Sequence, residues 1–219
     1  MPGKERSVKV AGGLKEDGVV VGNTYDKYGS GNPIVRRLMA GFDRTLSGFV
    51  RRADPESIHE IGCGEGYWVE KWSREGISAR GSDFSKQVID IAKTNASAAG
   101  LSANLFSVCS IYDLLPDRDT ADLIVCCEVL EHLEDPHAGL RALQGIVGRH
   151  LIVSVPREPL WCGLNLLRGK YVANLGNTPG HIQHWSSSKF NKFVSHYFDV
   201  IGHANPLPWT MLLCRPKSS

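Results

Sequence analysis

The feature that most constrains the fold of this chain is a regular alternation of short apolar runs with helical stretches. Strand-like runs occur at 57–61, 77–83, 104–108, 121–127 and 150–155. Helical stretches lie between them near 67–75, 85–99 and 136–147. Alternation with these lengths is typical of a parallel sheet covered by helices on both faces. Because such crossovers are right-handed, the order predicts a doubly wound α/β sheet.

The two ends of the chain add further elements. Asn32 and Pro33 are typical of a helix start, and apolar residues follow at helical spacing. Near the other end, residues 198–205 and 208–215 predict an antiparallel pair at the sheet edge. We therefore expect a seven-stranded, mostly parallel, Rossmann-like sheet with an antiparallel edge hairpin.

The remaining segments set the domain organisation that we expect. Residues 1–22 are rich in glycine and mixed in charge, which predicts a flexible tail. Residues 23–219 then form a single domain. A long irregular segment, 156–185, follows the fifth strand at the sheet edge where open α/β sheets bind ligands. It is interpreted either as a lid insertion over a substrate or as a packed surface excursion.

Composition excludes several classes of protein. With 25 basic and 23 acidic residues the net charge is only +2, which does not favour a nucleic-acid or membrane binder. No apolar run approaches the roughly 20 residues of a membrane helix, and residues 1–18 lack the apolar core of a secretion signal. The six cysteines form no CxxC pair, so free thiols in the cytoplasm are expected.

A glycine-rich turn follows the first of these strands. Gly62, Gly64 and Gly66 alternate between the strand and the next helix, with the spacing GxGxG. Glycines at this point allow a sharp turn and a close approach of the backbone to a ligand. Asp83 ends the second strand, where a carboxylate can accept both hydroxyls of a ribose. The two features together predict a nucleoside ligand.

At these residues the chain resembles the class I S-adenosylmethionine-dependent methyltransferases. The resemblance covers most of residues 55–155, through EIGCGEG, GSDFS, SIYDLLP and ADLIVCCEVLEHLEDP. The flanks YDKYGSGNPIVRRL and NTPGHIQHWSSSKF are similar to those of small bacterial methyltransferases that act on metabolites and quinones. The resemblance implies methyl transfer from S-adenosylmethionine to an oxygen atom of a small-molecule acceptor, with S-adenosylhomocysteine as the product.

The resemblance also implies roles for individual residues. Those implied to bind the cofactor are Glu60, Gly62, Cys63, Gly64, Gly66, Asp83, Phe84, Ser110, Ile111 and Glu128. Among them, Asp83 is implied to hold the ribose and Phe84 to lie against the adenine. Ser110 stands where many relatives have an acidic residue. Glu128 is implied to line the methyl-donor end.

Catalytic and acceptor-binding roles are less constrained by the sequence. His132 and His181 are candidate general bases, needed only if the acceptor loses a proton as it attacks. Trp161, His184 and Trp185 are candidates for the acceptor pocket. A divalent metal on Glu128, Glu131, His132 and His181 is an alternative, resembling the metal-dependent small-RNA 2′-O-methyltransferases. The main prediction contains no metal.

Three other functions remain as alternatives. The Glu-Glu-His pattern suggests metal-assisted RNA 2′-O-methylation, although the chain has no evident RNA-binding appendage. A nicotinamide-dependent reductase shares the general fold, but GxGxG is not its glycine spacing. A non-catalytic nucleoside-binding protein would retain the cofactor site alone.

Overall fold

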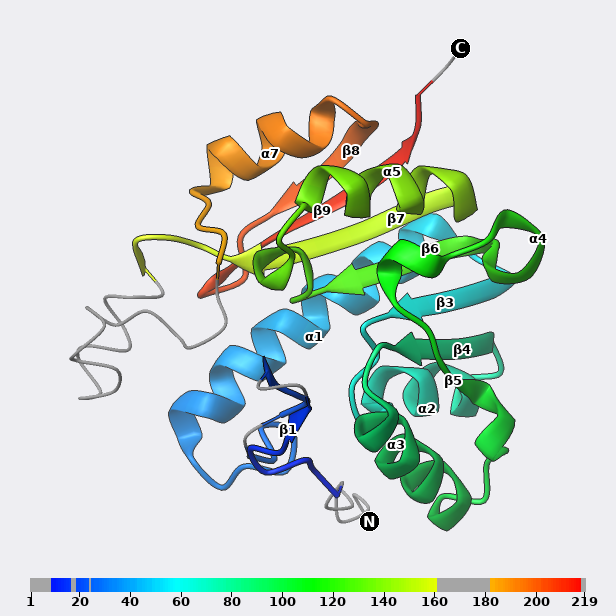
Figure 1. Ribbon diagram of the computed structural model, residues 1–219. Coiled ribbons are helices and arrows are strands. Elements are labelled where there is room, and N and C mark those ends of the chain that lie inside the picture. The colour runs from blue at the N-terminus through cyan, green and yellow to red at the C-terminus, as the bar shows by residue number, and fades with distance from the viewer. Residues whose placement is uncertain (1–8, 17–18, 24, 161–181, 218–219) are drawn as a thin grey trace.

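One seven-stranded sheet organises the chain, as the computed structural model in Figure 1 shows. The structure describes residues 9–16, 19–23, 25–160 and 182–217. The strand order is β5–β4–β3–β6–β7–β9–β8. The strands are β3 (Ser57–Ile61), β4 (Ser78–Asp83), β5 (Phe106–Val108), β6 (Ala121–Cys127), β7 (Val147–Pro156), β8 (Phe198–Ala204) and β9 (Trp209–Pro216).

The pairing of the strands confirms the predicted fold class. β3 pairs in parallel with β4 and β6, and the parallel pairing continues to β5 on one side and β7 on the other. β9 lies antiparallel between β7 and β8, which forms the edge. From β3 the chain adds β4 and β5 on one side, and it then returns to add β6 and β7 on the other side, so the strand order reverses between β3 and β6. The carboxyl ends of β4, β3 and β6 therefore lie side by side. Ligands of open α/β sheets bind at such a point.

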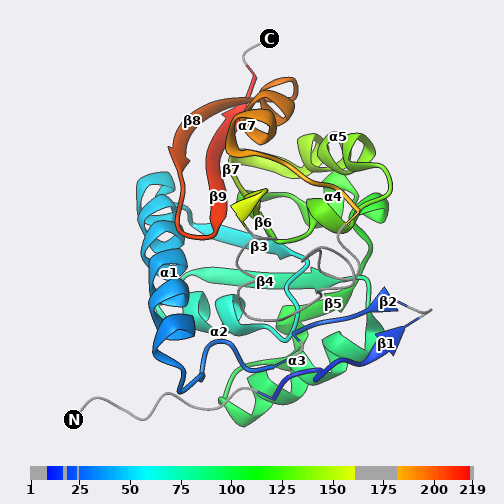
Figure 2. The ribbon, with the colours of Figure 1, turned by 90° about the vertical axis from the view of Figure 1, so that its left-hand side faces the viewer.

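Helices cover both faces of the sheet (Figures 1 and 2). One face carries α1 (Pro33–Ala53), α2 (Tyr67–Arg74) and α3 (Lys86–Ala98); the other carries α5 (Pro136–Ile146) and α7 (Ser187–Ser195). Short helices are α4 (Pro116–Asp119), η1 (Ala103–Leu105), η2 (Ile111–Asp113) and η3 (Leu130–His132). As predicted, Asn32 caps α1: its side-chain oxygen accepts the backbone N–H of Ile34 at 2.9 Å.

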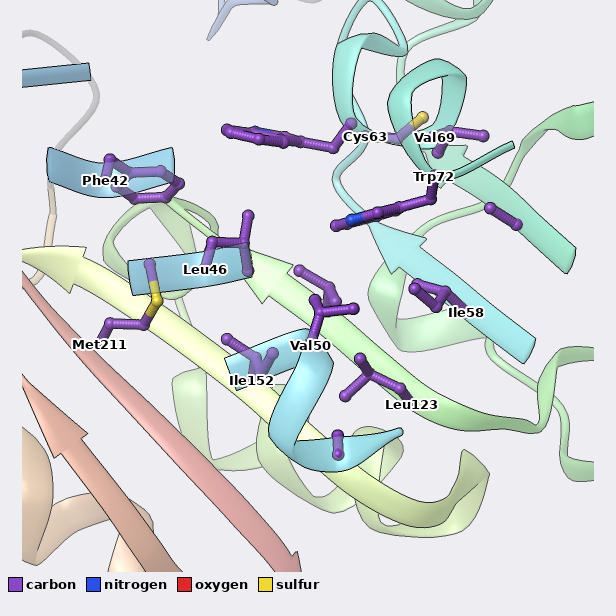
Figure 3. Packing of buried hydrophobic residues seen from close by; sticks show 14 of the residues in the cluster. Phe42, Leu46, Val50, Ile58, Cys63, Val69, Trp72, Leu123, Ile152 and Met211 are labelled. Carbon is purple, nitrogen blue, oxygen red and sulfur yellow. The ribbon is translucent and has the colours of Figure 1, made fainter. Parts of the chain in front are cut away.

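The hydrophobic core is divided between the two faces because strand side chains alternate in direction. On β6, Leu123 and Val125 pack with α1 and α2, whereas Ile124 and Cys126 pack with α5 and α7. Figure 3 shows the first of these layers, with Leu123 among the side chains under α1. Burial on both faces explains why the sequence of β6 is a continuous apolar run.

No helix in the described ranges is long and apolar enough to cross a membrane.

The N-terminal segment packs on α3 through a small hairpin, β1 (Lys15–Glu16) and β2 (Val19–Val20). Ala11 and Val21 are buried against Val88 and Ile91 of α3. In Figure 2 the hairpin lies beside α3. These contacts remove two apolar side chains of this segment from water. The flexible tail expected over residues 1–22 stays a prediction, as does the rest of the predicted domain organisation.

A buried histidine in β3 makes folding stability depend on pH. His59 is 1% exposed; its Nδ1 lies 2.9 Å from the Asp119 carbonyl oxygen and its Nε2 lies 3.0 Å from Ser82 Oγ. Burial lowers the pKa of His59 to about 4. Both ring nitrogens of His59 therefore contact neighbouring groups, one in α4 and one in β4.

We expect His59→Gln to flatten the acid dependence of stability. Between pH 6.5 and pH 4 the unfolded chain binds a proton on this ring that the folded chain does not bind. The free energy of unfolding therefore falls as the pH falls through that window, by about 3 kcal/mol in total. Urea unfolding at pH 7 and pH 4.5 checks this. The wild type should lose more stability than the variant between the two pH values, and equal losses would contradict the assignment.

Candidate functional site

The turn after β3 is joined to the end of β4 by backbone hydrogen bonds. Gly62, Gly64 and Gly66 have φ values of 73°, 53° and 87°, in the left-handed region that favours glycine. The N–H of Gly62 donates to the Ser82 carbonyl at 2.8 Å, and that of Cys63 donates to the same oxygen at 3.0 Å. A Cβ added at Gly62 would lie 2.3 Å from Cγ2 of Val129. The turn is thus packed between the ends of β4 and β6.

Asp83 lies at the end of β4 and contacts the same turn. Its Oδ2 accepts the Gly64 N–H at 3.2 Å, and its Oδ1 accepts the Ser85 N–H at 3.0 Å. Burial raises the pKa of Asp83, while these two N–H groups act in the opposite direction. Each ionised carboxylate oxygen has a second lone pair for a ligand. The glycine turn and Asp83, which the sequence predicts to bind one ligand together, are therefore in direct contact.

The other predicted adenosine contacts differ in exposure. Phe84, directly after Asp83, is 53% exposed. Ser110 uses its hydroxyl to cap η2, accepting the Tyr112 N–H at 3.3 Å. The side chains of Cys63 and Ile111 are buried in the two hydrophobic clusters. Direct contact with a ligand at Cys63 would therefore come through its backbone.

Three acidic side chains gather at the ends of β3 and β6. Glu60 is 3% exposed and Glu131 is 1% exposed, whereas Glu128 is partly buried. Burial raises the pKa of Glu60 and of Glu131 well above the usual range, and it raises the pKa of Glu128 to about 7. The positive charge of Lys27 opposes the rise in all three. Lys27 precedes α1, and its Nζ lies 5.3 Å from the ring centroid of Tyr28, whose ring stacks on the first residue of α2 after the glycine turn. A cation therefore lies near this end of the site.

The hydrogen bonds of these carboxylates are unequal. Glu128 accepts the indole N–H of Trp209 on Oε2 at 2.6 Å and the hydroxyl of Ser154 on Oε1 at 3.2 Å. It holds an uncommon φ of 61°, a conformation that non-glycine residues adopt mainly where surrounding structure enforces it. Within the described part of the chain, both oxygens of Glu131 and Oε2 of Glu60 are buried without a hydrogen-bond partner.

The predicted catalytic and metal-binding set is only partly described. His132 is exposed in η3, and His181 lies outside the described residues. Among the described residues there is no group of three or more His, Cys, Asp or Glu side chains able to hold a metal ion. Glu128, Glu131 and His132 accordingly form no such group. A role for His132 or His181 as a base stays a prediction.

The predicted acceptor pocket is likewise only partly described, since Trp161 lies outside the described residues. His184 is exposed, with its Nδ1 3.7 Å from Oε1 of Glu158. The indole of Trp185 stacks on Phe193 of α7 with ring centroids 5.4 Å apart. The contribution of these residues to an acceptor pocket stays a prediction.

Sequence reasoning missed Glu65, which stands inside the glycine motif. Its side chain is 2% exposed, and Oε1 accepts the N–H groups of Ala11 at 3.0 Å and Asn23 at 2.7 Å. The amide group of Asn23 donates to Oε2. Glu65 therefore fastens the N-terminal segment to the turn. No local sequence pattern identifies such a contact, because its partners lie more than 40 residues away along the chain.

Comparison with known proteins identifies the family. Residues 33–199 match a family model described as a methyltransferase domain. The chain belongs to this methyltransferase family, and the resemblance to class I S-adenosylmethionine-dependent methyltransferases is confirmed.

Curated relatives and solved structures agree with this assignment. The chain is 28% identical over 121 residues to a ubiquinone biosynthesis O-methyltransferase of Aeromonas salmonicida, covering 54% of this chain and 51% of the relative. It is 25% identical over 156 residues to the protein of that name from Xanthomonas euvesicatoria, covering 69% and 59%. The chain thus spans between half and three-fifths of the length of these relatives. Magnesium protoporphyrin IX methyltransferase from Synechocystis with bound SAH has the same fold, with a TM-score of 0.64 at 21% identity, covering 87% of this chain and 91% of that one.

Proposed function

We propose that this chain transfers the methyl group of S-adenosylmethionine to an oxygen atom of a small-molecule acceptor. The observation that carries the proposal is the bond between the Gly64 N–H and Asp83 Oδ2, which joins the glycine turn to the acidic end of β4. Membership of the methyltransferase family supports it, as do relatives whose names specify O-methylation. When bound, S-adenosylmethionine supplies a methyl group on a positively charged sulfur.

The residues present fit this cofactor. Asp83 retains lone pairs for two ribose hydroxyls after accepting its backbone N–H groups. The half-exposed ring of Phe84 offers an apolar surface for a base. Glu60 has a buried oxygen without a partner beneath the turn, which suits a ligand with a positively charged ammonium group. Methyl transfer then needs chiefly alignment and exclusion of water.

The acceptor is part of the proposal. We propose a low-molecular-weight acceptor rather than RNA, because the curated relatives are named as O-methyltransferases of ubiquinone biosynthesis, which is small-molecule chemistry. The predicted base, His132 or His181, is required only if the attacking oxygen carries a proton.

A cytoplasmic location is likewise proposed. The described cysteines Cys63, Cys109, Cys126, Cys127 and Cys214 are all unpaired, as expected in a reducing compartment.

A labelling experiment tests the proposed function. The purified chain is incubated with S-adenosylmethionine carrying an isotopically labelled methyl group, together with either a metabolite extract or a small-RNA fraction. We expect the label in small molecules, on oxygen as judged by mass-spectrometric fragmentation. Label found only in RNA, or only on nitrogen, would contradict the proposal. Parallel reactions with Asp83→Ala show whether any transfer depends on this site.

A further inference from the structure

Glu131 stands out because its carboxylate is buried without a hydrogen-bond partner among the described residues. It lies in η3, directly after β6, and its side chain is 1% exposed. Neither carboxylate oxygen has a hydrogen-bond partner in the part of the chain that the structure describes. A buried carboxylate without partners is costly, and such groups are usually paired or bind a ligand. Glu128 differs from it, since both of its oxygens accept hydrogen bonds.

The position of Glu131 matches the donor end of the proposed cofactor site. Asp83 ends β4, and β4, β3 and β6 are neighbours in the sheet. Neighbouring strands are about 4.8 Å apart, so the ends of β4 and β6 are separated by roughly 10 Å. The glycine turn joins these two ends, since Gly64 donates to Asp83 and Gly62 packs against Val129, so a ligand that extends from Asp83 along the turn would bring its sulfonium toward β6. Glu131 interacts electrostatically with Glu128 and Lys27, which both belong to this end of the site.

We propose that Glu131 supplies the counter-charge for the sulfonium of S-adenosylmethionine and that Lys27 opposes it. These two residues then set the preference of the site for the charged methyl donor over the uncharged product. The inference rests on the proposed function. It follows from charge: the donor and product share the adenosine, the ammonium and the carboxylate, and differ at the sulfur in one methyl group and one positive charge.

The site is a balance between opposing charges rather than a single ion pair. Burial favours the uncharged form of Glu131 because it raises the pKa of this carboxyl, whereas a sulfonium nearby favours the charged form. Lys27 already provides some positive charge near Glu131, which weakens the attraction of this carboxylate for the sulfonium. Removing either residue should therefore change the affinity for the donor but have little effect on affinity for the product.

The test compares the dissociation constants of S-adenosylmethionine and S-adenosylhomocysteine by calorimetric titration of the full chain. We expect Glu131→Gln to raise the ratio of the donor constant to the product constant by about ten-fold, as for the loss of one partly screened charge. Lys27→Met should lower the same ratio. A general folding defect would not move the ratio in opposite directions in the two variants.

Matched controls separate the possible outcomes. Glu134→Gln changes an exposed acidic residue three positions along the chain and should leave the ratio unchanged. A ratio that is unchanged in Glu131→Gln, or that moves the same way in both variants, would overturn the inference even though both ligands bind. If the wild type bound neither ligand, the proposed function itself would fail. Thermal unfolding of each ligand-free variant confirms that the compared proteins are folded.

Discussion

Replacing Asp83 with alanine is expected to abolish measurable binding of S-adenosylmethionine and S-adenosylhomocysteine. A hydrogen bond to a charged group contributes about 1.5–3 kcal/mol, and the proposed site uses two of them on the ribose. Their loss should weaken both ligands by more than about 100-fold. Calorimetric titration of the purified variant measures this directly. The effect should be equal for donor and product because both carry the same ribose.

Two further variants make the Asp83 result interpretable. Asp83 also accepts the N–H groups of Gly64 and Ser85, so alanine leaves both without this acceptor. Asp83→Asn retains the shape and one acceptor oxygen, and should still bind far more weakly than the wild type. Asp90→Ala removes a carboxylate from α3 whose side chain is 55% exposed and paired with Lys86, and should bind normally. Normal binding by Asp83→Ala would contradict the proposal that Asp83 holds the ribose.

The second large effect is expected for Gly66→Ala, which should destabilise the fold. Gly66 has a φ of 87°, and a Cβ there would lie 2.5 Å from Cζ of Phe106 and 3.3 Å from Cβ of Ala92. The left-handed conformation costs roughly 1–2 kcal/mol for alanine, and overpacking adds about 1–3 kcal/mol. We expect the free energy of unfolding to fall by about 2–5 kcal/mol in urea titrations.

Gly100→Ala provides the matched control for the backbone contribution. Gly100 has a φ of 75°, similar to that of Gly66, but an added Cβ would meet no atom within 4 Å. Its substitution should cost only the conformational part, roughly 1–2 kcal/mol. If the two alanine variants lost the same stability, close packing of the turn against Phe106 would not be what requires glycine at position 66.

Local patterns predicted the sheet and the turn well because both depend on neighbouring residues. Strand bounds at 57–61 and 121–127 coincide with β3 and β6, whose apolar runs are buried on both faces. The glycine turn and Asp83 could be paired from the sequence because parallel strands end at one edge of a sheet. The helix start at Asn32 followed from capping chemistry.

Contacts between distant segments could not be predicted in this way. The bond from Trp209 to Glu128 joins residues 81 positions apart, and only the antiparallel pairing of β7 with β9 brings them together. The attachment of the N-terminal segment through Glu65 is equally non-local, and composition alone suggested a tail. Lys27 lies in the same part of the chain, so its effect on the buried carboxylates depends on that attachment.

The most direct test of the central claim is thermal unfolding of the wild-type chain with S-adenosylmethionine, S-adenosylhomocysteine or NADH. A ligand present at 100 times its dissociation constant should add about 2.7 kcal/mol to the free energy of unfolding. We predict that both adenosyl ligands raise the unfolding temperature and that NADH does not. A rise with NADH alone would contradict the methyltransferase assignment in favour of a reductase, and no rise with either adenosyl ligand at saturating concentration would contradict the cofactor site.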